Sequence, residues 1–183
     1  AQDGPNLFHT FGRFGLGGPG DTALFANTTP NLVTRNILGR ITGGEISRVN
    51  GTIDRSQYNG ANLFLINPAG FIFGPSATLN VGGSFHVSSA DFVRFADGST
   101  FSMSTTQESG LSVADPVSFG FLGPRGPITV ENSFLQVPPG QALGIGGRND
   151  VGRLGGRGFR GPLRFRRFGP RGLVGLPEGL LGG

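Results

Sequence analysis

The stretch from Asn62 to Gly83 reads Asn-Leu-Phe-Leu-Ile-Asn-Pro-Ala-Gly-Phe-Ile-Phe-Gly-Pro-Ser-Ala-Thr-Leu-Asn-Val-Gly-Gly. It predicts three short β-strands, at 62–66, 70–73 and 78–81, because apolar and β-branched residues are interrupted by turn residues. Between the first two strands, Pro68 fixes φ, Gly70 permits a left-handed conformation, and Asn67 can hydrogen-bond the turn backbone. The stretch therefore predicts two apolar strands around one tight turn, within an all-β fold.

The same pattern extends in both directions from this stretch. We expect further strands at 7–11, 23–26, 32–42, 45–49, 51–53, 84–88, 91–95, 99–103, 117–122, 128–130, 134–137 and 142–145. Segment 32–42 also has apolar spacing that suits a helix of about two turns. Gly39, Gly43 and Gly44 interrupt it and β-branched residues dominate, so a strand is favoured.

The strand patterns distinguish two kinds of all-β fold. Apolar residues run consecutively at 63–66 and 71–73, but alternate with polar residues at 79–81 and 85–87. This mixture, with Gly and Asn at the corners, favours a β-solenoid whose outer face is partly covered. A β-sandwich or jelly roll has a similar number of strands. The dipeptides Asn50-Gly51 and Asn59-Gly60 keep antiparallel hairpins as an alternative.

Composition narrows the function classes. The chain has 183 residues, enough for one domain with a real core, and no cysteine, which excludes disulfides, thiolate nucleophiles and cysteine-ligated metals. No apolar run is long enough for a transmembrane helix. Residues 1–147 contain seven arginines against nine acidic residues, whereas 148–183 contain eight arginines against two. The basic character belongs to the second part, so we expect no nucleic-acid binding by the fold.

Catalytic and metal-binding patterns are weak. His9 and His86 lie far apart in the sequence, and neither has metal-ligand spacing with a second ligand. A β-helix polysaccharide lyase or hydrolase would need clustered carboxylates, but only Asp91 and Asp97 are close neighbours. We therefore expect no enzyme, no catalytic residue, no metal and no cofactor.

The Asn62–Gly83 stretch resembles the N-terminal two-partner secretion domain, also called the haemagglutination activity domain, of filamentous haemagglutinin-like exoproteins. That family carries Asn-Pro-Asn-Gly-Ile after an apolar strand and before Phe-Gly-Pro. The matching residues here are Asn67, Pro68, Ala69, Gly70 and Phe71, followed by Phe73-Gly74-Pro75. A second family landmark, Asn-Pro-Asn-Leu, is approximated by Thr29-Pro30-Asn31-Leu32.

The resemblance implies a right-handed parallel β-helix, with short antiparallel additions, that carries the secretion signal of a large exoprotein. The implied partner is an outer-membrane transporter whose periplasmic POTRA domains recognise the chain. The exoprotein would cross the periplasm, pass the barrel unfolded, and fold at the cell surface or outside the cell. Asn67, Pro68, Ala69, Gly70, Phe71, Pro30, Asn31 and Leu32 would form the export or folding motif. Within it, a role in fold nucleation is favoured over direct contact for Asn67, Pro68 and Gly70.

Other roles stay open at this stage. Rows of exposed Asn, Ser and Thr could make the domain a glycan-binding adhesin module, with glycans or host surfaces as partners. A monomer is expected. The polar start at Ala1-Gln2-Asp3 shows no signal peptide. Family members usually have a further strand segment upstream, so we expect an N-terminally truncated domain.

The predicted domain covers residues 1–147, and 148–183 form an Arg/Gly-rich low-complexity tail. Gly, Arg, Leu and Pro supply most of this tail. It could bind single-stranded RNA, form a disordered basic linker, or be the product of out-of-frame translation. The last interpretation is favoured, because GC-rich codons read in a wrong frame yield such a mixture. We expect no solenoid strands there.

Overall fold

The computed structural model describes residues 1–28, 30–104 and 111–147 with their side chains, and the backbone of strands 163–167 and 173–177. Every regular element in these described ranges is a β-strand, and they contain no helix. The all-β prediction is therefore confirmed. Nothing in the described residues forms a helix with the length and hydropathy needed to cross a membrane.

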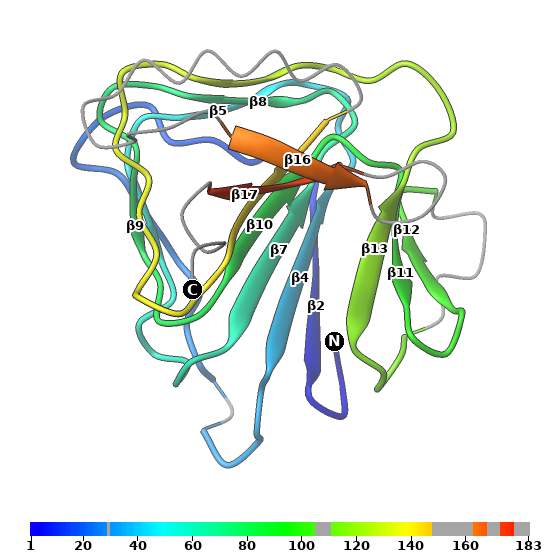
Figure 1. Ribbon diagram of the computed structural model, residues 1–183. Helices are drawn as coiled ribbons and strands as arrows, with labels where there is room; N and C mark the ends of the chain where they lie inside the picture. Colours follow the sequence, from blue (N-terminus) through cyan, green and yellow to red (C-terminus); the bar gives the residue numbers. More distant parts are fainter. Residues whose placement is uncertain (29, 105–110, 148–162, 168–172, 178–183) are drawn as a thin grey trace, which may run out of the picture.

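The chain returns repeatedly to the same sheets, and each run of the chain from one strand of sheet A to the next is called a pass. In three sheets, strands from successive passes lie side by side and pair in parallel (Figure 1). Sheet A has the order β1 (Gln2–Asp3), β2 (Asn6–Phe11), β4 (Asn36–Ile41), β7 (Asn62–Ile66), β10 (Phe85–Ser88) and β15 (Leu143–Gly146). Sheet B contains β5 (Ser47–Val49), β8 (Phe71–Phe73) and β14 (Ile128–Val130), and sheet C contains β3 (Thr22–Leu24), β6 (Thr52–Asp54) and β9 (Thr78–Asn80). Only β1 breaks the parallel pattern in these sheets, since it pairs antiparallel with β2.

Two complete passes visit the sheets in the order A, B, C, whereas, among the described residues, the pass that begins with β2 has no named strand in sheet B and the pass that begins with β10 has none in sheet C. The pass β4, β5, β6 is followed by the pass β7, β8, β9. Parallel register then places equivalent residues in rows, such as Ile37 beside Leu63 and Leu63 beside Phe85. These three side chains are fully buried in the main core, which also contains Ile53 from sheet C. Hence the core lies between the three sheets and is formed by alternate residues of each strand.

A second core covers the other face of sheet A. Sheet D is antiparallel, with the order β12 (Thr100–Ser102), β11 (Phe92–Phe95) and β13 (Pro116–Gly120). Its residues Phe95 and Phe101 pack with Phe8, Leu38 and Ile66 of sheet A. Figure 1 shows sheet D beside the strands of sheet A. Because sheet A is buried on both faces at these positions, its strands contain consecutive apolar residues, as the sequence predicted.

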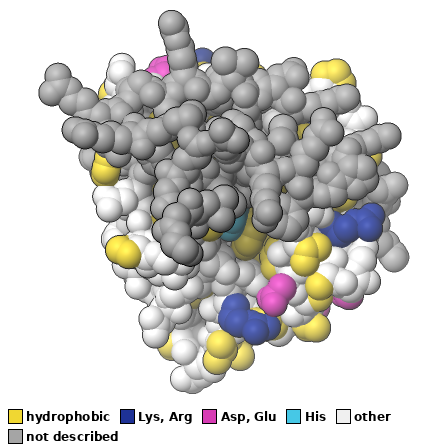
Figure 2. All heavy atoms as spheres, in the orientation of Figure 1, with side chains coloured by type: hydrophobic (Ala, Val, Ile, Leu, Met, Phe, Trp, Pro, Cys, Tyr) yellow, Lys and Arg dark blue, Asp and Glu magenta, His cyan; other side chains and the backbone are white. Residues whose placement is uncertain are grey.

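Figure 2 shows the surface on the same side of the molecule. Among the described side chains visible there, arginine and acidic residues form small separate groups between neutral and hydrophobic ones.

Several strand predictions need correction. Segment 134–137 forms no strand: Asn132 before it has a positive φ of 53°, and the consecutive prolines at 138 and 139 restrict the backbone after it. The strand predicted at 32–42 forms only at 36–41. Asn50-Gly51 and Asn59-Gly60 join strands of different sheets, so they form no hairpins. Parallel pairing in sheets A, B and C also argues against a β-sandwich, which is built from antiparallel strands.

Beyond residue 147, two strands are described, β16 (Leu163–Arg167) and β17 (Leu173–Pro177). They pair antiparallel with each other as a two-stranded sheet. The other residues of the predicted tail lie outside the described residues, so the predicted division at residue 147 stays a prediction.

Candidate functional site

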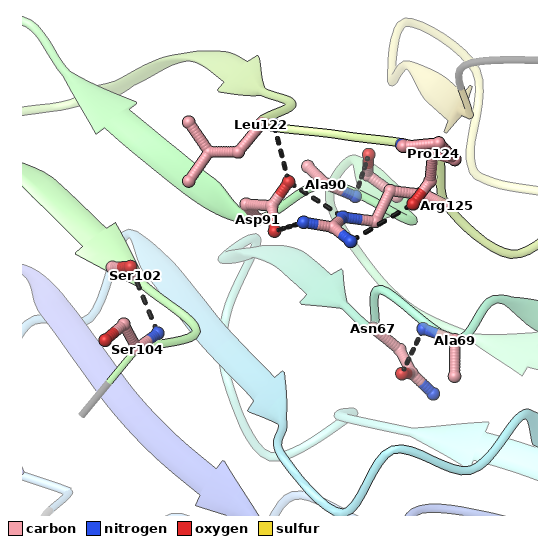
Figure 3. Close-up of polar contacts among 10 residues, drawn as sticks. Asn67, Ala69, Ala90, Asp91, Ser102, Ser104, Leu122, Pro124 and Arg125 are labelled. Carbon is pink, nitrogen blue, oxygen red and sulfur yellow. Dashed lines mark hydrogen bonds and ion pairs between the residues drawn. The ribbon is translucent and has the colours of Figure 1, made fainter. Parts of the chain in front are cut away.

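The turn at residues 67–70 connects β7 of sheet A to β8 of sheet B. Asn67 is fully buried, and its Oδ1 accepts a hydrogen bond from the Ala69 amide at 3.0 Å (Figure 3). The Asn67 carbonyl accepts a second bond from the Gly70 amide at 2.9 Å. Gly70 has a φ of 99°, in the region that favours glycine. The local turn predicted from Asn67 and Gly70 is therefore confirmed, and Ala69 contributes its backbone amide to it.

The side chain of Asn67 also reaches the preceding pass. Its Nδ2 donates hydrogen bonds to the Glu45 carbonyl and to Ser47 Oγ, both at 2.9 Å. The side-chain amide is thus used as a double donor and as an acceptor. Since Glu45 and Ser47 lie at the entry to β5, Asn67 ties the turn to the corner of the previous pass.

The following pass covers the opposite side of the turn. The Gly126 amide donates to the Pro68 carbonyl at 2.8 Å, and the Phe71 amide donates to the Pro127 carbonyl at 3.0 Å. A Cβ on Gly126 would overlap the Ala69 carbonyl, so this close approach requires glycine. The turn is therefore enclosed between two passes, and its polar groups are used within the fold.

Phe71 begins β8 and belongs to the main core. In the register of sheet B it lies between Ser47 and Ile128. Its ring is fully buried and nearly parallel to that of Phe73, with centroids 6.0 Å apart. The five residues 67–71 therefore form one unit, a polar turn followed by a core anchor.

Pro30, Asn31 and Leu32 lie elsewhere in the fold. They are exposed, in the loop between β3 and β4, and Leu32 is 51% exposed. This loop leads into the amino end of β4, whereas the 67–70 turn follows the carboxyl end of β7. Because β4 and β7 are parallel, the two parts of the predicted motif are at opposite ends of sheet A. They do not form one site.

Sequence reasoning missed a ladder of asparagines at the amino ends of three strands of sheet A. Asn36 Nδ2 donates to Asn6 Oδ1 at 2.9 Å, and Asn62 Nδ2 donates to Asn36 Oδ1 at 3.0 Å. Asn6 Nδ2 donates in turn to the Ser112 carbonyl at 2.7 Å, which connects the ladder to the segment before β13. The repeated pattern of Asn before two apolar residues, at 6–8, 36–38 and 62–64, was the available signal.

A second missed feature is the pair formed by Asp91 and Arg125 (Figure 3). Arg125 Nε donates to Asp91 Oδ2 at 2.8 Å, and its Nη2 donates to Asp91 Oδ1. Asp91 Oδ2 also accepts from the Leu122 amide at 2.7 Å. Both side chains are mostly buried. Asp91 precedes the three strands of sheet D and Arg125 follows them, so the pair joins the two ends of the segment that forms this sheet. Because Arg125 is next to Gly126, the pair also positions the segment that covers the 67–70 turn.

The carboxylates and histidines considered for catalysis are engaged in structural contacts. Asp97 accepts hydrogen bonds from the Ser99 and Ser112 hydroxyls, and these bonds lower the pKa of its carboxyl, with those of Ser99 the largest cause. His86 stacks on Phe64 with centroids 4.6 Å apart, and burial lowers its pKa to about 4. Burial likewise lowers the pKa of His9. No group of three potential metal ligands occurs among the described residues.

Comparison with known families identifies the chain. A family model described as the TPS secretion domain matches residues 1–160. The chain belongs to this family. The match includes the 67–71 unit, the Pro30–Leu32 loop and all the strands from β1 to β15. No curated protein and no solved structure matches the chain significantly.

Membership in the TPS secretion domain family confirms the resemblance to filamentous haemagglutinin-like exoproteins. TPS secretion domains belong to secreted exoproteins that are exported through the outer membrane in two-partner systems. The partner in such a system is an outer-membrane transporter. The family is not a family of enzymes.

Proposed function

We propose that residues 1–147 are a right-handed parallel β-helix that serves as the secretion-signal domain of a larger exoprotein. In this proposal, the POTRA domains of the partner transporter recognise the chain in the periplasm. The exoprotein then crosses the barrel unfolded and folds at the cell surface as a monomer. The domain performs no catalysis and requires no metal or cofactor. The observation that carries the proposal is the family match over residues 1–160.

The sheet topology supports the β-helix. Equivalent strands of sheets A, B and C pair in parallel, and the two complete passes β4–β6 and β7–β9 visit the sheets in the same order. Each pass buries its apolar residues against the pass before it, as Leu63 does against Ile37. Folding can therefore advance one pass at a time, and each added pass makes return through the transporter less favourable. This is a physical route to export without nucleotide hydrolysis.

The surroundings of the 67–71 unit support a role in folding over a role in contact. Asn67 is fully buried and bonded to the pass before, while Pro68 and Phe71 are bonded to the pass after. A transporter could reach the fully buried Asn67 and Phe71 only before the chain folds. We therefore assign Asn67, Pro68, Ala69, Gly70 and Phe71 to nucleation of the corner between sheets A and B. The Pro30–Leu32 loop is the exposed part of the motif, whereas Pro68 and Ala69 are half-buried, so a partner of the folded domain would contact this loop first.

The proposal is tested by secretion of the full chain behind a secretory leader, with and without a partner transporter. We expect the chain in the medium only when the transporter with intact POTRA domains is present. Purified POTRA domains should also retain the chain in a pull-down. Secretion that is independent of the transporter, or of its POTRA domains, would refute the proposal.

A glycan-binding adhesin is the second candidate, and sheet C favours it. On its exposed side, the Thr52 and Thr78 hydroxyls lie 2.8 Å apart, and Asn80 Nδ2 donates to Asp54 Oδ2 at 2.8 Å. Such rows repeat polar groups at the spacing of adjacent strands, about 4.8 Å. Binding of the wild-type chain to a polysaccharide, with loss of binding in a Thr52→Val/Thr78→Val variant, would establish this function. Equal binding by both proteins would remove it.

A further inference from the structure

Arg55 is a fully buried arginine within the apolar interior. It follows β6 directly, and its side chain has 0% exposure. The register of sheet C pairs Leu24, Asp54 and Asn80, so Arg55 occupies the same row as Phe25 and Val81. Backbone bonds continue the pairing there, from Phe25 to Asp54 and from Arg55 to Asn80. Both neighbours in this row are buried and apolar.

The surroundings of the guanidinium satisfy little of its hydrogen-bonding capacity. Nη1 donates to the Tyr58 carbonyl at 3.2 Å. Nε and Nη2 are buried and have no hydrogen-bond partner in the described part of the chain. A Cβ on Gly83 would overlap the Gly60 and Ala61 carbonyls and would also lie 2.8 Å from Nη2, so glycine fits this corner between the backbone and the guanidinium.

No acidic side chain balances this charge within the described residues. The adjacent Asp54 accepts hydrogen bonds from the Ser56 amide and the Asn80 side chain on the exposed side of sheet C. A guanidinium stays charged at all ordinary pH values. Burial of such a charge without a counter-ion costs free energy, and hydrophobic replacements of buried charged groups often stabilise proteins. An apolar side chain, like those of Phe25 and Val81, would therefore suit this row better.

We propose that Arg55 holds down the stability of the folded domain, so that the chain stays unfolded long enough to pass through the transporter. The proposal rests on the export function proposed above. A residue that opposes the completion of folding is useful before export, because a folded domain cannot pass the barrel. After export, the burial of apolar residues by the passes that follow Arg55 compensates for the cost of burying its charge.

The test substitutes Arg55→Met, which keeps a long unbranched side chain and removes the charge. Arg48→Met is the matched control, because Arg48 lies on β5 with its side chain exposed. We expect Arg55→Met to raise Tm by about 3–6 °C and to slow unfolding, with Arg48→Met near the wild type. Secretion of the Arg55→Met chain should fall several-fold. Adding Ile53→Val, which removes one buried methyl group, should lower Tm again and restore secretion.

Each outcome has a defined meaning. A Tm for Arg55→Met at or below that of the wild type would overturn the proposal, whatever the secretion result. A raised Tm with unchanged secretion would overturn the link to export. Failure of the wild-type chain to be secreted by the transporter would instead refute the export function, and Tm alone would then decide whether Arg55 limits stability.

Discussion

Replacement of Asn67 by alanine tests how much of the stability of the 67–70 turn comes from this one side chain. The change removes three hydrogen bonds, to the Glu45 carbonyl, to Ser47 Oγ and from the Ala69 amide. The Ser47 hydroxyl can rotate to a new partner, but the two backbone groups lose theirs. An unpaired buried polar group costs about 1–3 kcal/mol; because both of these bonds are only partly buried, about 1–2 kcal/mol applies to each, and the expected loss is about 2–4 kcal/mol. That is a large share of the roughly 5–15 kcal/mol of a typical domain.

The assay is equilibrium unfolding in urea. The chain has no tryptophan and one tyrosine, so fluorescence of the buried Tyr58 reports on one place in the fold. Circular dichroism of the β-strands provides a second, global probe. Coincident transitions from both probes would license a two-state free energy of unfolding.

Asn80→Ala is the control for this experiment. Asn80 is an exposed asparagine whose side chain donates one hydrogen bond to Asp54, so we expect a loss below about 1 kcal/mol. A loss for Asn67→Ala no larger than that for Asn80→Ala would refute the reasoning. It would show that the turn is held by Pro68 and Gly70 and by two backbone bonds, one from the Gly126 amide to the Pro68 carbonyl and one from the Phe71 amide to the Pro127 carbonyl.

Three further outcomes are expected. Gly70→Ala should cost about 3 kcal/mol or more in the same urea assay, because φ is 99° and the new Cβ would overlap the Pro127 carbonyl; an unchanged midpoint would contradict this. Asp91→Asn should lower the free energy of unfolding by about 2–3 kcal/mol, because it weakens a mostly buried ion pair. A double-mutant cycle with Arg125→Met should show a coupling free energy above about 1 kcal/mol, whereas additive losses would show that the two side chains do not stabilise the fold as a pair. His86 has a pKa of about 4 in the folded state against 6.5 in the unfolded state, so its contribution to stability is complete above pH 6.5 and is lost as the pH falls toward about 4. His86→Phe should therefore lose less stability than the wild type between pH 7 and pH 4.5, and equal losses would show that other groups carry the acid sensitivity.

Much of the fold could be predicted from local patterns. Strands 62–66 and 128–130 form at the predicted residues, and most others shift by one or two positions at their ends. Partial covering of sheet A was also predicted, from the consecutive apolar residues at 63–66, and Phe64 and Ile66 do pack toward sheet D. The wrong strand at 134–137 has apolar residues in a strand-like pattern but lies between a left-handed Asn132 and two prolines. Local propensity could not show that this segment packs Leu135 and Val137 into the main core without forming a strand.

The candidate site divides in the same way. The turn at 67–70 follows from residue types alone, because Asn, Pro and Gly each restrict or extend the backbone at their own position. Its enclosure does not follow from residue types. Glu45 and Ser47 lie about one pass before Asn67, and Gly126 and Pro127 come after the whole of sheet D. Because the residues of sheet D are inserted between the two contacting segments, their separation in the sequence differs from that of other neighbouring passes, and a search for a constant repeat length would not find this contact.

By itself, the sequence determined the all-β class, the tight turn between two apolar strands, and the resemblance to the TPS secretion domain. Only the tertiary structure decided which strands are neighbours, which asparagines form a ladder, and that Arg55 is buried in a row with Phe25 and Val81. The physical reason is the range of the interactions. Backbone preferences and side-chain alternation act over a few residues, whereas parallel pairing joins residues a whole pass apart and assigns each side chain its neighbours only when the passes stack.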